Sequence, residues 1–138
     1  LNNILAKIEA NLAGVPEAIM LNQEGYVAEC TGDNIFIIKG KTLFTPASVH
    51  GALKGITRDV AMELAARIGL EVREELLTRY DLYVADECFL TGTAAEVIPV
   101  VEIDGRKIGT GAPGPYTREL VKLYREKAMS EGTPIYDE

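Results

Sequence analysis

An unbroken apolar run in the first third of the chain constrains the fold more than any other feature. The segment Asn34–Lys39 contains four consecutive large apolar residues, and a short run of β-branched and aromatic side chains is typical of a strand. It ends at Lys39-Gly40-Lys41, a predicted turn, and Thr42-Leu43-Phe44 follows as the partner strand of a hairpin. We therefore expect the chain to build on a sheet.

Three helices and several further strands are expected around this hairpin. Apolar residues at helical spacing predict helices over the first dozen residues, after Gly55 and from Pro115, a residue suited to the first helical position. Strands outnumber helices and connections are mixed, so the fold class is α/β, as a pseudo-barrel or an α+β sheet, and residues 1–138 form one domain. The further strands are expected at residues 17–21, 26–28, 70–76, 87–91 and 97–103, with a helical turn at 78–85 and a hairpin turn at Asp104-Gly105.

The charges and cysteines exclude several classes of partner. The net charge is −7 and Lys and Arg form no basic stretch, which argues against nucleic acid. No apolar stretch reaches the length of a membrane span, so no membrane partner is expected. Cys30 and Cys88 lie far apart without a CxxC motif, and we expect free thiols of a reducing compartment, the cytoplasm.

Isolated polar residues do not suggest a metal centre. His50 is the only histidine and lies in a predicted loop, so it cannot complete a metal site or a catalytic triad. Asp86-Glu87 is an acidic pair without further ligands at suitable spacing, and we expect a solvated turn there.

The first residues of the chain already follow a helical pattern. Leu1, Ile4, Leu5, Ile8 and Leu12 fall on one helical face. No Ser, Thr or Asp cap precedes them, so the helix would begin in the middle of a turn. We therefore expect the chain to be a fragment of a longer protein.

A carboxylate followed by small residues is the first of three segments that suggest chemistry. Glu29 lies where the strand predicted at residues 26–28 gives way to Cys30-Thr31-Gly32, expected as a turn. A carboxylate there could lie beside the nitrogen of a flat heterocycle and keep that nitrogen protonated. Judged alone, the same residue fits an ordinary surface glutamate in a turn better.

Two loops rich in glycine and threonine are the other segments. Gly55-Ile56-Thr57 opens a predicted helix, and the unpaired N–H groups at a helix N-terminus bind phosphate well. Thr57 could instead be a plain N-cap. Thr91-Gly92-Thr93-Ala94-Ala95 follows a buried strand; its threonines carry hydroxyl groups, and its alanines leave backbone N–H groups accessible.

These three segments, in this order and spacing, resemble the C-terminal half of the fold-type IV pyridoxal-phosphate aminotransferases, and the resemblance extends over essentially the whole chain. The Ala94-Ala95 pair is more similar to branched-chain amino acid aminotransferases than to D-amino acid transaminases or aminodeoxychorismate lyases. The resemblance implies the C-terminal pseudo-barrel domain of that fold and pyridoxal 5′-phosphate as cofactor. The implied reaction moves the amino group of leucine, isoleucine or valine to 2-oxoglutarate.

The resemblance also implies which residues surround the cofactor and the substrate. All of them lie on or next to the three segments. Cofactor binding is implied for Glu29 at the pyridine nitrogen, Leu53 against the ring, and Gly55, Ile56, Thr57 and Thr93 at the phosphate; substrate binding is implied for Gly32, Ala94 and Ala95.

The catalytic lysine is the part of the family pattern that this chain lacks. The resemblance places the Schiff-base lysine a few residues upstream of Leu1, so no catalytic residue is expected within the chain, which alone should be inactive. The family's N-terminal half is the expected partner, and family members form homodimers or larger homo-oligomers.

Two other interpretations stay open at this point. One is a different enzyme of the same fold, a D-amino acid transaminase or an aminodeoxychorismate lyase. The other is a non-catalytic fragment that binds pyridoxal phosphate or promotes oligomerisation.

Overall fold

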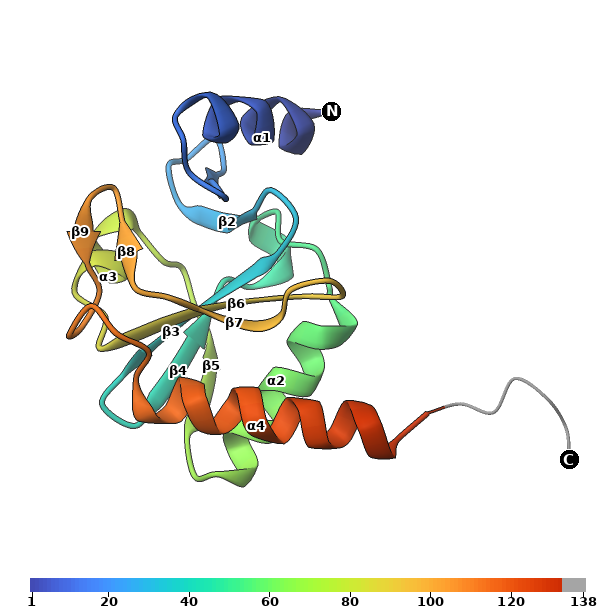
Figure 1. The fold of residues 1–138 in the computed structure, drawn as a ribbon. Coiled ribbons are helices and arrows are strands. Elements are labelled where there is room, and N and C mark those ends of the chain that lie inside the picture. Colours follow the sequence, from blue (N-terminus) through green and yellow to red (C-terminus); the bar gives the residue numbers. More distant parts are fainter. Residues whose placement is uncertain (133–138) are drawn as a thin grey trace, which may run out of the picture.

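The apolar run predicted as a strand forms the middle of a five-stranded sheet. In the computed structural model, which describes residues 1–132, β3 (Asn34–Lys39) lies between β4 (Thr42–Thr45) and β6 (Glu87–Gly92). The strand order is β5-β4-β3-β6-β7, with β5 (Glu71–Glu74) and β7 (Glu96–Val100) at the edges. Among the described strands of this sheet, only β4 and β5 pair in parallel (Figure 1). Residues 133–138, which the sequence analysis included in the domain, lie outside the described part.

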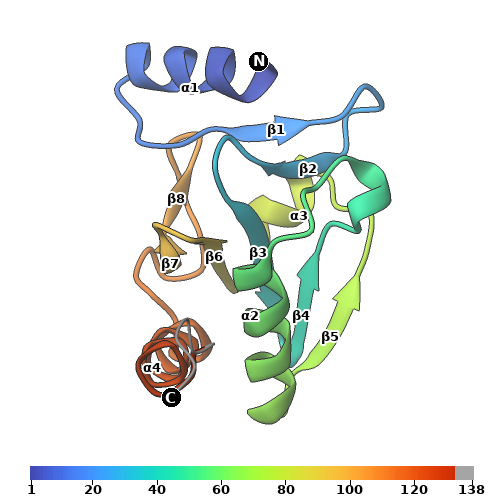
Figure 2. The ribbon, with the colours of Figure 1, turned by 90° about the vertical axis from the view of Figure 1, so that its right-hand side faces the viewer.

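Two helices cover one face of this sheet. The helices α2 (Ile56–Arg67) and α4 (Pro115–Ser130) lie side by side on that face (Figure 2). Phe36 and Phe89 stack beneath them, with ring centroids 4.8 Å apart. Alternate strand residues point to this layer because side chains along a strand alternate between faces.

Smaller elements cover the opposite face. They contribute to a second apolar cluster around Ile35, Ile37 and Cys88. The elements are β2 (Val27–Cys30), which pairs with β1 (Ile19–Leu21), α3 (Arg79–Tyr83), and β8 (Glu102–Ile103), which pairs with β9 (Arg106–Lys107). The mixed architecture that the sequence predicted is therefore confirmed. None of the helices in residues 1–132 combines the length and apolar character needed to cross a membrane.

The helix at the start of the chain has an exposed apolar face. It forms as predicted, as α1 (Asn2–Leu12), but its apolar stripe stays outside both clusters. The five residues of the stripe are all exposed: Leu1, Ile4, Leu5, Ile8 and Leu12, at 50% or more. In both views α1 lies beyond β1 and β2, away from the sheet (Figures 1 and 2).

One predicted strand and one short helix differ between the prediction and the structure. The strand expected at residues 97–103 divides after Val100, where the chain leaves the sheet to form the β8–β9 hairpin. That hairpin turns at Asp104 and Gly105, both with positive φ, as predicted. A short 3-10 helix, η1 (Ser48–His50), was not foreseen.

The prediction for Glu87 was wrong. Its carboxylate is 7% exposed and accepts hydrogen bonds from the N–H groups of Tyr116 and Thr117 and from the Thr117 hydroxyl. It thereby satisfies donors in the first turn of α4. A Cβ on Gly114 would overlap this carboxylate, so glycine gives it room.

Replacing Glu87 should therefore detach the start of α4. For Glu87→Ala we expect the free energy of unfolding to fall by about 2–3 kcal/mol, because hydrogen bonds to a buried charged group are lost. Urea unfolding followed by circular dichroism measures this change. The matched control is Glu119→Ala, at an exposed position of the same helix; an equal loss in both variants would contradict the assigned role.

Candidate functional site

The three segments singled out in the sequence meet at one end of the five-stranded sheet. Asn34, at the start of β3, pairs with Thr91, near the end of β6. The turn Thr93-Ala94-Ala95 follows β6 directly, and α2 begins against Asn34 at Gly55. Distant parts of the chain thus form one edge of the molecule.

Glu29 reaches this edge from β2, inside a strand and not in the turn predicted for it. It pairs with Met20 of β1, and the turn follows at residues 31–33. Strand pairing thus extends through Cys30, where the sequence analysis expected a turn of small residues. Its half-buried carboxylate accepts hydrogen bonds from the Leu53 N–H (2.7 Å, Oε2) and the Asn3 amide (3.1 Å, Oε1).

Asn3 was missed by the sequence analysis. Its side-chain amide also donates to the Thr31 carbonyl, at 3.2 Å. It lies 26 positions before Glu29 on a helix chosen for its apolar stripe, and no local pattern marks an asparagine that makes such a distant contact.

The start of α2 is open to a ligand. Its N-cap residue is Gly55, and no described side chain caps the helix, so first-turn N–H groups stay available for an anion. Thr57 is the second helical residue, and the plain N-cap interpretation is therefore wrong. Ile56 (85%) and Leu53 (71%) are exposed beside this helix start.

The arginine next to this helix start serves the core. Arg58 is 2% exposed, donates to the Pro46 carbonyl at 3.1 Å and pairs with Glu74. The sequence analysis did not count it among the ligand residues, and its contacts agree with a structural role.

The third segment presents its backbone at the surface. Thr93 and Ala94 are exposed and Ala95 is half-buried in the turn between β6 and β7. Just before it, a Cβ on Gly92 would overlap the Asp33 carboxylate, so the turn at residues 31–33 lies against this loop as well. Gly32 is exposed in that turn. The Thr91 hydroxyl is buried without a hydrogen-bond partner among the described residues.

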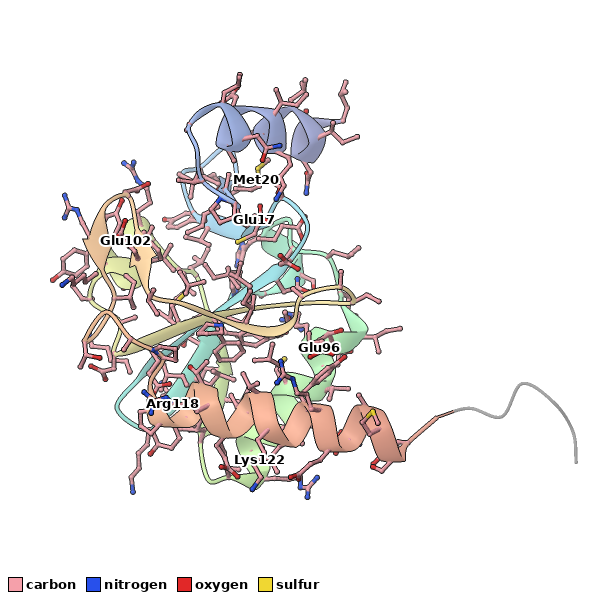
Figure 3. All side chains as sticks on the ribbon, in the orientation of Figure 1. Glu17, Met20, Glu96, Glu102, Arg118 and Lys122 are labelled. Carbon is pink, nitrogen blue, oxygen red and sulfur yellow. The ribbon has the colours of Figure 1, made fainter. Side chains whose placement is uncertain are left out.

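Two carboxylates, of Glu17 and Asp33, interact at the turn of residues 31–33. Glu17 accepts hydrogen bonds from the Thr31 hydroxyl, the Thr31 N–H and the Ala18 N–H (Figure 3 labels Glu17, below α1). Burial opposes its ionisation, but these bonds and the charge of Lys7 outweigh burial and lower its pKa. The pKa of Asp33 is raised, by burial first and then by the charge and hydrogen bonding of Glu17.

Burial also acts on the two cysteine thiols. Both are buried and free, and burial raises the pKa of each thiol, with Glu17 adding to the effect at Cys30. Within residues 1–132, no group of three or more His, Cys, Asp or Glu side chains could hold a metal ion.

Comparison with known proteins shows which family the chain matches. Residues 1–103 match the family described as amino-transferase class IV. The branched-chain-amino-acid aminotransferase of Pseudomonas aeruginosa is 52% identical over 124 residues, which are 90% of this chain and 40% of that protein. The chain spans about half the length, or less, of the curated relatives it matches.

Solved structures give the same result for the fold. The crystal structure of the Escherichia coli branched-chain amino acid aminotransferase superimposes with a TM-score of 0.88 at 44% identity, over 90% of this chain and 42% of that one. The enzyme of Thermobaculum terrenum in its PLP-form gives a TM-score of 0.87 at 46% identity, over 91% and 41%. The fold-type IV architecture implied by the sequence is thereby confirmed.

The raised pKa of Asp33 leads to a prediction on stability. The raised pKa means that the folded state favours the protonated Asp33 carboxyl. Ionisation of Asp33 therefore lowers the free energy of unfolding. The loss sets in as the pH rises from the pKa of the unfolded chain, about 3.9, through the higher pKa of the folded protein. Asp33→Asn, which mimics the neutral form, should raise the free energy of unfolding at pH 7, and the gain should vanish near pH 3. Urea unfolding at both pH values measures it. Glu24→Gln, an exposed charge removal, is the control; a gain independent of pH would contradict the assignment.

Proposed function

The chain belongs to the amino-transferase class IV family, and from that premise we propose that it is the cofactor-binding domain of a branched-chain aminotransferase. The whole enzyme would use pyridoxal 5′-phosphate to move the amino group of leucine, isoleucine or valine to 2-oxoglutarate. One observation carries the proposal: a carboxylate, an uncapped helix start and an exposed Thr-Ala-Ala turn converge at one end of the sheet.

The residues at this edge have the chemistry that the cofactor requires. Glu29 can hold a proton on a ring nitrogen, since its carboxylate is fixed and half-exposed. The exposed side chain of Leu53 can pack against a flat ring. The uncapped N–H groups after Gly55 can bind the phosphate, as N–H groups at helix starts do. When bound, pyridoxal phosphate supplies a ring that accepts electrons from the substrate.

The remaining assignments concern the phosphate and the substrate. Thr93 offers a hydroxyl group in an exposed turn, and Thr57, which is 7% exposed, offers one beside the start of α2. The amides of the Ala94-Ala95 turn can bind a carboxylate without a charged side chain, and the small side chains leave room for a branched substrate. The proposed cofactor-binding set is Glu29, Leu53, Gly55, Ile56, Thr57 and Thr93, and the proposed substrate-binding set is Gly32, Ala94 and Ala95.

Partners and location form part of the same proposal. The exposed apolar stripe of α1 supports burial of this helix against the N-terminal half of the enzyme or a second copy in a homo-oligomer. The two buried, unpaired thiols support a reducing compartment, and we propose the cytoplasm.

Binding of pyridoxamine 5′-phosphate tests the site without a lysine. Calorimetric titration of the chain should show saturable binding. We expect it to weaken about tenfold in Thr57→Val and more in Glu29→Gln, since hydrogen bonds to charged groups contribute about 1.5–3 kcal/mol.

Two exposed positions outside the three segments serve as matched controls for this titration. Glu24→Gln and Thr110→Val make the same chemical changes there and should leave the affinity unchanged. A folded chain that does not bind, or that binds equally well in all four variants, would refute the residue assignments.

Activity tests separate the related enzymes. Joined to the family's N-terminal half with its lysine, the chain should transfer amino groups from L-leucine, L-isoleucine and L-valine. The chain alone should not, because none of its lysines matches the family's catalytic position. Formation of glutamate from 2-oxoglutarate, followed with a coupled dehydrogenase, measures both. Preference for D-amino acids would favour the D-amino acid transaminase instead.

A further inference from the structure

Asn34 occupies a position between the carboxylate of Glu29 and the start of α2. It is 7% exposed, begins the central strand β3, and shares with Phe36 the face of the sheet that α2 covers. Its amide nitrogen donates to the Leu53 carbonyl at 2.8 Å. A buried side-chain amide therefore lies directly against the proposed cofactor-binding residues.

Both backbone polar groups of Leu53 are held by side chains. Its N–H donates to Glu29 and its C=O accepts from Asn34. One residue thus links the proposed ring carboxylate to the core of the sheet. The link is polar throughout, because the Leu53 side chain is 71% exposed and adds little apolar packing of its own.

Asn34 also touches the start of α2. A Cβ on Gly55 would overlap its amide oxygen, so only glycine lets the helix start approach this closely. Lys54, between the two contacts, is exposed. Three consecutive residues, 53–55, therefore connect the residue bonded to Glu29 with the first turn of α2. Asn34 donates a hydrogen bond to the first of them and lies against the last.

We propose that Asn34 is a positioning residue that fixes the separation between Glu29 and the N-terminus of α2. The inference rests on the proposed function, in which a ligand spans these two groups, its ring nitrogen at Glu29 and its phosphate at the helix. Such a ligand binds well only when both ends meet their partners at once. A ligand that uses one end alone is insensitive to the separation.

Two variants disturb this link by different routes. Asn34→Ala removes the amide, and Gly55→Ala keeps it but forces it away from the helix start. Both should weaken pyridoxamine 5′-phosphate about tenfold, the usual effect of one lost hydrogen bond to a buried group. In Asn34→Ala, inorganic phosphate, measured by displacement titration, should bind within about twofold of the unchanged chain. Combining Asn34→Ala with Glu29→Gln should cost less than the sum of the single changes, because the pair acts through Leu53.

Asn22→Ala is the matched control. The Asn22 amide nitrogen donates to the His50 carbonyl, at the other end of the same loop, at 3.4 Å, and its amide oxygen accepts from the Glu24 and Tyr26 N–H groups in the β1–β2 turn. If any loosening of this loop weakened the binding of pyridoxamine 5′-phosphate, Asn22→Ala would weaken it about tenfold as well. That result would refute the positioning role of Asn34. Equal losses for pyridoxamine 5′-phosphate and inorganic phosphate in Asn34→Ala, or additive effects of Asn34→Ala and Glu29→Gln, would refute it too.

The inference and the proposed function fail in different ways. Binding that depends on Glu29 and Thr57 but not on Asn34 or Gly55 overturns the inference alone. A folded, unchanged chain that binds no pyridoxamine 5′-phosphate overturns both. Circular dichroism and urea unfolding of each variant confirm that the titrated protein is folded.

Discussion

The hydrogen bonds to the Glu29 carboxylate are the contacts on which the arrangement of the site depends. They join three parts of the chain that share little apolar surface: α1 through Asn3, β2 through Glu29 itself, and the loop before α2 through Leu53. Such bonds are directional, and a carboxylate accepts them strongly. The position of the loop before α2 therefore depends on these polar contacts as well as on packing.

The rigid part of the molecule lies behind this edge. Two apolar clusters, one on each face of the sheet, fix the strands and the body of α2, and Arg58 ties the first turn of α2 to Pro46 and Glu74. A tightly packed interior resists deformation, so it keeps the elements attached to it at fixed relative positions. The loops at the end of the sheet can therefore stay exposed and still keep their relative places, which suits a site built on backbone groups.

The sequence was informative wherever the signal was local. The apolar run predicted β3 to the residue, and Asp104-Gly105 predicted a hairpin turn. It misjudged Glu87, whose partners lie about 30 positions away in α4, and it missed Asn3 for the same reason. Periodicity predicted the apolar stripe of α1 but not its exposure, because periodicity shows which residues share a face and not what covers that face. The three segments of the proposed site could be singled out because each is contiguous in the sequence.

An open edge with apolar side chains and unpaired amides has a physical consequence. Leu53 and Ile56 expose apolar surface beside helix N–H groups that no described side chain caps. Water can hydrogen-bond to the N–H groups, but its contact with the apolar surface is unfavourable. A flat ligand with an anionic end would satisfy the N–H groups and cover the apolar surface together, and the proposed contact with Glu29 would hold its far side. Ordinary capping by Ser, Asp or Asn would stabilise α2 and block this site; glycine at the cap leaves the helix less stable and the site open.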